Sequence, residues 1–174
     1  MMSLPLRDAP PQEFLLPVKP SFIVATLVAA LLLNLLPWSG YGLWLRPDFV
    51  ALVLLYWCIE QPRRVGFTAA WVLGLLMDVG DGVLFGQHAL AYSLLAYAGI
   101  VLHRRVRMFP LPLQVLHVMP LLLVNEVIVL VLRLAAGGEF PGLRYFLGAV
   151  IGGVLWAPVS VLLKLPQRPP ESDA

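Results

Sequence analysis

Six apolar stretches, separated by short segments that contain proline, glycine or charged residues, run along the chain. They occupy residues 21–37, 47–59, 65–77, 88–102, 111–134 and 143–165. A hydrocarbon core of about 30 Å needs about 20 helical residues at about 1.5 Å each, so the last two stretches are long enough to cross a bilayer. The middle three are shorter and need flanking residues or a locally thinner bilayer. The pattern predicts an all-α membrane protein with six transmembrane helices.

The composition agrees with this prediction. Apolar residues make up 60% of the 174 residues and charged residues only 13%. A soluble domain of this size could not hide so much apolar surface from water, so lipid is the expected solvent of its exterior. We expect one six-helix transmembrane domain over residues 21–165. Residues 1–20 and 166–174, which are rich in proline and mixed in charge, are predicted to be disordered tails.

Basic residues give the expected orientation, because lysine and arginine near the ends of membrane spans are retained in the cytoplasm. With six spans, one side collects nine of them, namely Arg7, Lys19, Arg63, Arg64, Arg104, Arg105, Arg107, Lys164 and Arg168. The other side has three, namely Arg46, Arg133 and Arg144. This bias predicts that both termini, and therefore both tails, are cytoplasmic.

Several functional classes receive no support from the sequence. The net charge of +2 is small and the arginines are scattered, so nucleic-acid binding is not expected. Cys58 is the only cysteine, which excludes an intrachain disulfide and a cysteine-cluster metal site. The three histidines are not at metal-ligand spacing, and no HExxH, serine-nucleophile or phosphate-loop motif occurs. We therefore predict a protein that is not an enzyme and has no cofactor or metal.

Polar residues within the apolar stretches are costly in a membrane and need an explanation. The candidate interface or structural polar residues are Asp48, Asp78, Asp81, Gln87, His88, Asn125, Glu126 and Arg133. In the predicted topology these residues, and Asn34 with them, fall in the non-cytoplasmic half of the bundle. Arg133 follows Glu126 by two helical turns on one face, so either could neutralise the other through an intermediate partner or a water. The group is either a structural polar cluster or a site for a polar ligand or a partner's side chain.

The segment 78–88 alternates glycine and aspartate with bulky apolar residues. This pattern predicts a tight turn that folds back into the outer leaflet, with glycines at positive φ. Asp78 and Asp81 are expected to cap a helix start or to pair with His88. A catalytic aspartate pair is disfavoured, because the GxGD pattern of intramembrane aspartyl proteases is missing.

Small residues recur at four-residue spacing on two predicted helices. Gly66, Ala70 and Gly74 share one face, and Gly148 and Gly152 form a GxxxG pattern. Such faces let helices approach closely. They indicate either packing within the chain or an interface with another membrane protein.

Five short motifs stand out along the chain, namely Arg46-Pro47-Asp48-Phe49, Leu52-Val53-Leu54-Leu55-Tyr56-Trp57, Pro62-Arg63-Arg64-Val65-Gly66, Gly74-Leu75-Leu76-Met77-Asp78 and Gly86-Gln87-His88-Ala89-Leu90-Ala91-Tyr92. Together they resemble the MreD family of bacterial rod-shape-determining proteins of the inner membrane. The resemblance implies a non-enzymatic part of the cell-elongation machinery that builds lateral peptidoglycan. It also implies a fold similar to the six-helix substrate-binding subunits of energy-coupling-factor transporters. It supplies no catalytic residue.

The resemblance also implies partners. Family members are thought to bind the bitopic protein MreC and, through it, MreB filaments and the elongation peptidoglycan synthases. The first hypothesis is therefore a scaffold that presents a groove or a small-residue face to a partner's transmembrane helix. The alternative is a small-molecule binding or transport subunit, which the polar residues of the non-cytoplasmic half would suit.

Overall fold

The computed structural model describes residues 18–38, 40 and 46–167, and these residues form α-helices without any β-strand. The helices are α1 (Pro20–Leu35), α3 (Phe49–Glu60), α4 (Phe67–Asp81), α5 (Gln87–Arg107), α6 (Leu111–Ala135) and α7 (Leu147–Lys164), with 3₁₀ turns η1 (Leu143–Phe146) and η2 (Leu165–Gln167). The all-α prediction is confirmed. The predicted disordered tails fall mostly outside the described residues, as do Arg7 and Arg168.

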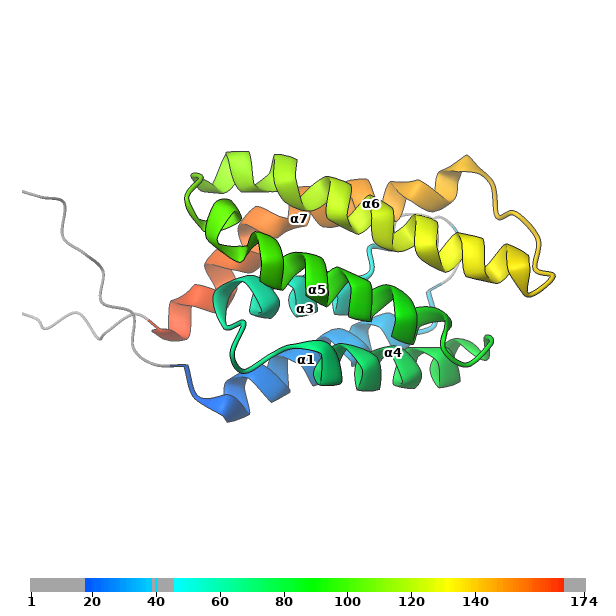
Figure 1. Cartoon of the computed structure of the whole chain (residues 1–174), viewed down its shortest axis with the longest axis horizontal. Helices are drawn as coiled ribbons and strands as arrows, with labels where there is room; N and C mark the ends of the chain where they lie inside the picture. Colours follow the sequence, from blue (N-terminus) through cyan, green and yellow to red (C-terminus); the bar gives the residue numbers. More distant parts are fainter. Residues whose placement is uncertain (1–17, 39, 41–45, 168–174) are drawn as a thin grey trace, which may run out of the picture.

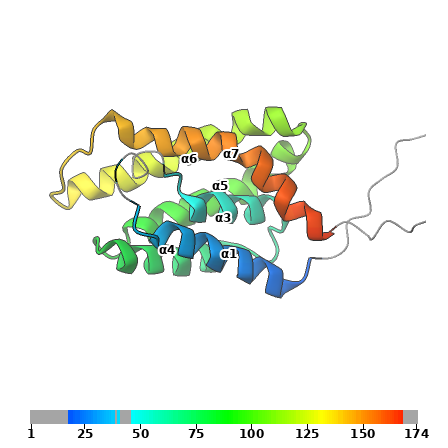
Figure 2. The same ribbon diagram turned by 180° about the vertical axis from the view of Figure 1, so that it is seen from behind.

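Helix α3 lies at the centre of the molecule. Its residues 50–59 are all buried, and the helix contacts α1, α5, α6 and α7. Figures 1 and 2 show α6 and α7 on one side of α3 and α5, with α1 and α4 on the other side. A helix that is apolar on every face is stable only when other elements surround it. The uniformly apolar sequence of α3 therefore explains its central position.

The outer surface of the bundle is apolar. Large hydrophobic side chains are exposed on the faces of the outer helices, among them Val24 on α1, Leu116 and Val124 on α6, and Val154 and Leu162 on α7. A soluble protein of this size rarely leaves so much contiguous apolar surface in contact with water. This exterior fits a lipid environment.

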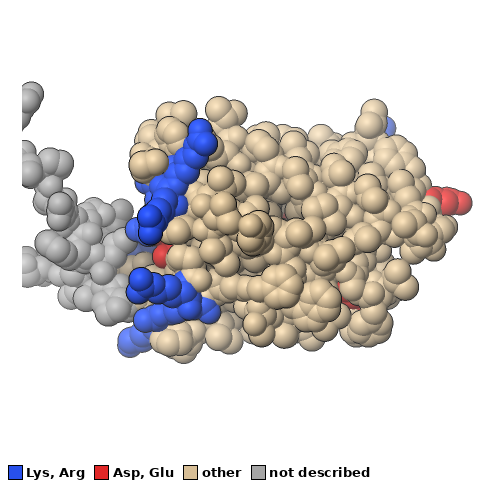
Figure 3. All heavy atoms as spheres, viewed as in Figure 1, with Lys and Arg blue, Asp and Glu red and all other residues tan. Residues whose placement is uncertain are grey.

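Charged side chains are concentrated at the ends of the bundle. Figure 3 shows lysine and arginine gathered at the end where the described chain begins and finishes. At this end Glu60 lies 3.6 Å from Arg107 Nε and 3.4 Å from Lys164 Nζ, which links the last turns of α3, α5 and α7. Most of the described basic residues therefore lie at one end of the helix bundle, as the sequence predicts.

Two described helical runs are long and apolar enough to cross a membrane, judged by length and composition: Leu111–Ala135 and Leu143–Gln167. Helices α1 and α3 are apolar but have 16 and 12 residues, and α3 is therefore only about 18 Å long. Asp48 caps one end of α3, and the other end is followed by Pro62. Six complete crossings remain a prediction.

The predicted tight turn between α4 and α5 is shorter than the segment 78–88. Helix α4 continues to Asp81 and ends at Gly82, whose left-handed backbone (φ 62°) lets its N–H bond to the carbonyls of Asp78 and Val79. Gly86 has φ 98° just before α5 begins. The predicted positive-φ glycines are present at these two positions, where other residues would be strained.

The small residues of the two predicted faces lie against the chain's own helices. A Cβ added to Gly74 would overlap Ala89 Cα in α5. A Cβ added to Gly148 would lie 2.8 Å from the Arg46 carbonyl, and one added to Gly152 would lie 3.1 Å from Leu122 Cδ1 in α6. Ala70 is fully buried, whereas a Cβ added to Gly66 would make only an ordinary van der Waals contact. These contacts favour packing within the chain over an interface with another protein.

Gly74→Ala should destabilise the protein by about 1–3 kcal/mol, because the new methyl group would collide with backbone atoms that cannot rotate away. Gly80→Ala in the same helix is the matched control, since its Cβ would meet only the flexible end of Leu35. We expect Gly80→Ala to be neutral or slightly stabilising. Thermal unfolding in detergent compares the two. Equal unfolding midpoints would show that α4 and α5 are not in close contact.

Candidate functional site

A cavity of ≈ 1020 Å³ lies at the end of the bundle opposite the ion pairs of Glu60 with Arg107 and Lys164. Side chains from α1, α4, α5 and α6, from the start of α3 and from the segment before α7 line it. Among these are seven of the eight candidate polar residues predicted from the sequence, namely Asp48, Asp81, Gln87, His88, Asn125, Glu126 and Arg133. The structure therefore brings residues from four helices into one site.

Asp78, the eighth candidate, lies behind His88 and holds the start of α5. Its Oδ2 accepts a hydrogen bond from the Gly86 N–H at 2.8 Å, and its Oδ1 accepts one from the His88 N–H at 2.7 Å. His88 Nδ1 is 2.9 Å from the same Oδ1, and His88 Nε2 is 3.9 Å from Asp81 Oδ2. The carboxylate satisfies N–H groups of the first turn that have no partner within the helix. The predicted capping and pairing with His88 are both present.

Asp48 joins three helices. As the N-cap of α3, its Oδ1 accepts a hydrogen bond from the Ala51 N–H at 3.0 Å and another from Asn34 Nδ2 of α1 at 2.9 Å. The hydroxyl of Tyr92 in α5 donates to the same carboxylate, 2.9 Å from Oδ1 and 2.8 Å from Oδ2. Asn34 Oδ1 in turn accepts from the Phe49 N–H at 2.9 Å. We call Asn34, Asp48 and Tyr92 the Asp48 cluster.

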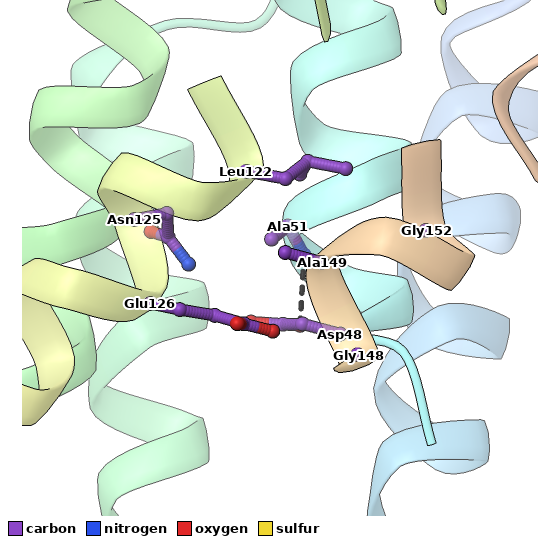
Figure 4. Close-up of a pocket in the computed structure, with 8 residues that line it drawn as sticks. All are labelled: Asp48, Ala51, Leu122, Asn125, Glu126, Gly148, Ala149 and Gly152. Carbon is purple, nitrogen blue, oxygen red and sulfur yellow. Dashed lines mark hydrogen bonds between the residues drawn. The ribbon is translucent and has the colours of Figure 1, made fainter. Parts of the chain in front are cut away.

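A much smaller recess adjoins the Asp48 cluster between α3, α6 and α7. It measures ≈ 10 Å³, about the space of one water molecule. Figure 4 shows Glu126 of α6 pointing toward Asp48 and Asn125 lying beside it. Glu126 Oε2 and Asn125 Oδ1 are buried and have no hydrogen-bond partner in the described part of the chain. Two hydrogen-bond acceptors of α6 are thus unoccupied here.

Arg133 lines the cavity farther along α6 and is exposed. No direct ion pair joins it to Glu126, and seven residues of helix separate them by about 10 Å along the axis. The indirect neutralisation predicted from the sequence stays a prediction. Within residues 18–38, 40 and 46–167, no group of three or more histidine, cysteine, aspartate or glutamate side chains is placed to hold a metal ion.

The sequence analysis did not list Asn34 and Tyr92 among the candidate site residues, although it placed Asn34 with the polar residues of the non-cytoplasmic half. Tyr92 lies four residues after His88 on the same face of α5, and this spacing is a signal that could have identified it. Asn34 stands out as a polar residue in an apolar stretch, but nothing in the sequence indicates its pairing with Asp48, which is 14 residues away across a connection. The cavity wall also includes Arg46, Arg144 and Tyr145, which the sequence did not single out as site residues.

An all-helical chain with an apolar exterior, charged ends and polar side chains gathered inside one half has the construction of an α-helical membrane protein. A family model described as rod shape-determining protein MreD matches residues 18–165. Rod shape-determining protein MreD of Haemophilus influenzae is 30% identical over 146 residues, which cover 84% of this chain and 90% of that protein. The chain therefore belongs to the MreD family of rod shape-determining membrane proteins. No solved structure matches it, so the likeness to energy-coupling-factor subunits stays a prediction.

Tyr92→Phe should lower the free energy of unfolding by about 1.5–3 kcal/mol, the usual contribution of a buried hydrogen bond to a charged group. Tyr92 is fully buried, and its hydroxyl donates to Asp48. Tyr97→Phe is the control, because Tyr97 is in the same helix and is 66% exposed. Unfolding of both variants in one detergent measures the difference. A Tyr92→Phe variant as stable as Tyr97→Phe would contradict the proposed joining role of Asp48.

Proposed function

We propose that this protein is a multi-pass scaffold of the rod complex in the bacterial inner membrane, with both termini in the cytoplasm. The observation that carries the orientation is the concentration of basic side chains at one end of the helix bundle. Basic residues at span ends are retained on the cytoplasmic side. The polar cavity then faces the opposite side of the membrane, where the peptidoglycan wall is built.

The scaffold role is supported by how the helices are held together. The central helix is buried along its length, Gly74 lets α4 and α5 meet at backbone distance, and the Asp48 cluster ties three helices together. Such a bundle presents fixed outer surfaces. We infer that it binds an MreC-type bitopic protein, and through it MreB and the elongation peptidoglycan synthases. This role in lateral wall synthesis requires no catalytic group in the chain itself.

A partner helix must bind on the outside of this bundle. Gly74 and Gly148 face the chain's own helices, so the groove expected from the sequence is filled by the protein itself. The exposed apolar faces include Val28 on α1, Val124 on α6 and Val154 on α7. The three residues lie on three different helices, so each marks a separate outer face.

We expect MreC to co-purify with the tagged protein from detergent when the two are expressed together, whereas an unrelated bitopic protein should not. Val28→Trp, Val124→Trp and Val154→Trp place the same bulky side chain on the three faces without entering the core. One of them should reduce the MreC recovered at least about tenfold, while all three elute as folded proteins. Failure of MreC to bind the folded wild-type protein would refute the scaffold proposal. If all three variants recovered as much MreC as the wild-type protein does, the contact would lie outside these faces.

A further inference from the structure

The recess beside Asp48 has the size and the chemistry of a site for one small group. The side chains of Asn125 and Glu126 are 2% and 8% exposed, and Asn125 Oδ1 and Glu126 Oε2 lack hydrogen-bond partners among the described residues. Burying an acceptor without a donor costs free energy that most proteins avoid. Two such acceptors lie side by side and border a space of ≈ 10 Å³. This arrangement indicates a binding site for a group that donates hydrogen bonds.

The charges around the recess indicate the sign of that group. Its lining is Asp48, Ala51, Leu122, Asn125, Glu126, Gly148, Ala149 and Gly152, which includes two carboxyl groups and no lysine, arginine or histidine. A group that enters must donate hydrogen bonds and is favoured by positive charge. A primary ammonium is close to water in size and carries three N–H donors, which suits the acceptors of Asp48, Asn125 and Glu126.

The recess and the wider cavity share part of their lining. Asp48, Asn125 and Glu126 border both spaces. The cavity also contains Arg46 and Arg133, which are basic groups suited to a phosphate or carboxylate. Its ≈ 1020 Å³ is at the upper end of the usual range for small-molecule sites. A ligand with its ammonium in the recess could thus place an anionic group among these arginines.

We propose that the cavity binds a zwitterionic ligand through a primary ammonium held by Asp48, Asn125 and Glu126, with its phosphate toward Arg46 and Arg133. Phosphoethanolamine has this chemistry, either as the headgroup of a phospholipid or as a free soluble molecule. A phosphocholine group carries the same charges, but its quaternary ammonium has no N–H donor and is too large for the recess. Replacing ethanolamine by choline therefore tests the binding of the ammonium in the recess, because the phosphate contacts stay unchanged.

The test compares the full-length protein in nanodiscs of phosphatidylethanolamine, of phosphatidylcholine and of phosphatidylglycerol, and in detergent with free phosphoethanolamine or phosphocholine. Native mass spectrometry measures bound lipid, and thermal unfolding measures the shift in midpoint. We expect phosphatidylethanolamine to be retained about tenfold more than phosphatidylcholine and to raise the midpoint by about 5 °C. Glu126→Gln should remove this preference, and Glu139→Gln, an exposed acid at the same end, should keep it.

The comparison of membrane lipids with free headgroups distinguishes a lipid ligand from a soluble one. An ethanolamine preference seen with lipid alone supports the proposal with a phospholipid as the source, and one reproduced by free phosphoethanolamine supports it with a soluble ligand. Equal binding of ethanolamine and choline forms by the wild-type protein overturns it, and this comparison needs no variant to fold. An ethanolamine preference that survives Glu126→Gln overturns it as well. Displacement of every lipid by a lysine-containing partner segment would assign the recess to a protein partner and also overturn it.

Discussion

The hydrocarbon core of a bilayer cannot hydrate a polar side chain, so polar groups among the helices are stabilised mainly by partners within the protein. The Asp48 carboxylate shows how this constraint shapes the fold. It accepts hydrogen bonds from the first turn of α3, from Asn34 of α1 and from Tyr92 of α5. The hydrocarbon tails of lipids offer no alternative donor, and the contact therefore fixes where three helices meet. The position of the buried central helix depends on it.

The cavity follows from the short length of that central helix. Helix α3 has 12 residues and begins just after its N-cap Asp48, whereas α6 has 25 residues and continues well past that point. The space beyond the start of α3 is therefore not filled by a helix, and the polar ends of α1, α4, α5 and α6 face it. At the opposite end of α3, Glu60 lies beside Arg107 and Lys164. One end of the central helix is closed by ion pairs, and the other borders a polar cavity.

Much of this architecture could be predicted from the sequence. The six apolar stretches match the six described α-helices closely, because apolar runs bounded by proline, glycine and charge define helix ends well. The pairing of Asp78 with His88 was predictable since the two residues flank one short turn. The α4 end was misplaced by four residues, because the capping geometry of Gly82 depends on backbone conformation.

Contacts between distant parts of the chain were not predictable in the same way. Asn34, Asp48 and Tyr92 belong to three helices, and their meeting depends on how those helices pack. The neighbours of the small-residue faces could also be identified only from the structure. Spacing alone cannot tell whether Gly74 contacts another helix of the chain or a partner protein. The two unpartnered acceptors of α6 became visible only once the packing of α3 and α7 around them was known.

The orientation of the bundle is tested most directly by labelling single cysteines with a membrane-impermeant maleimide in spheroplasts. Cys58 is fully buried and should give no background. Glu139→Cys lies at the cavity end, and Met108→Cys, at a position 75% exposed, lies at the basic end. We predict that Glu139→Cys is labelled from outside and that Met108→Cys is labelled only after the membrane is permeabilised. Labelling of Met108→Cys in intact spheroplasts, with Glu139→Cys protected, would contradict the account.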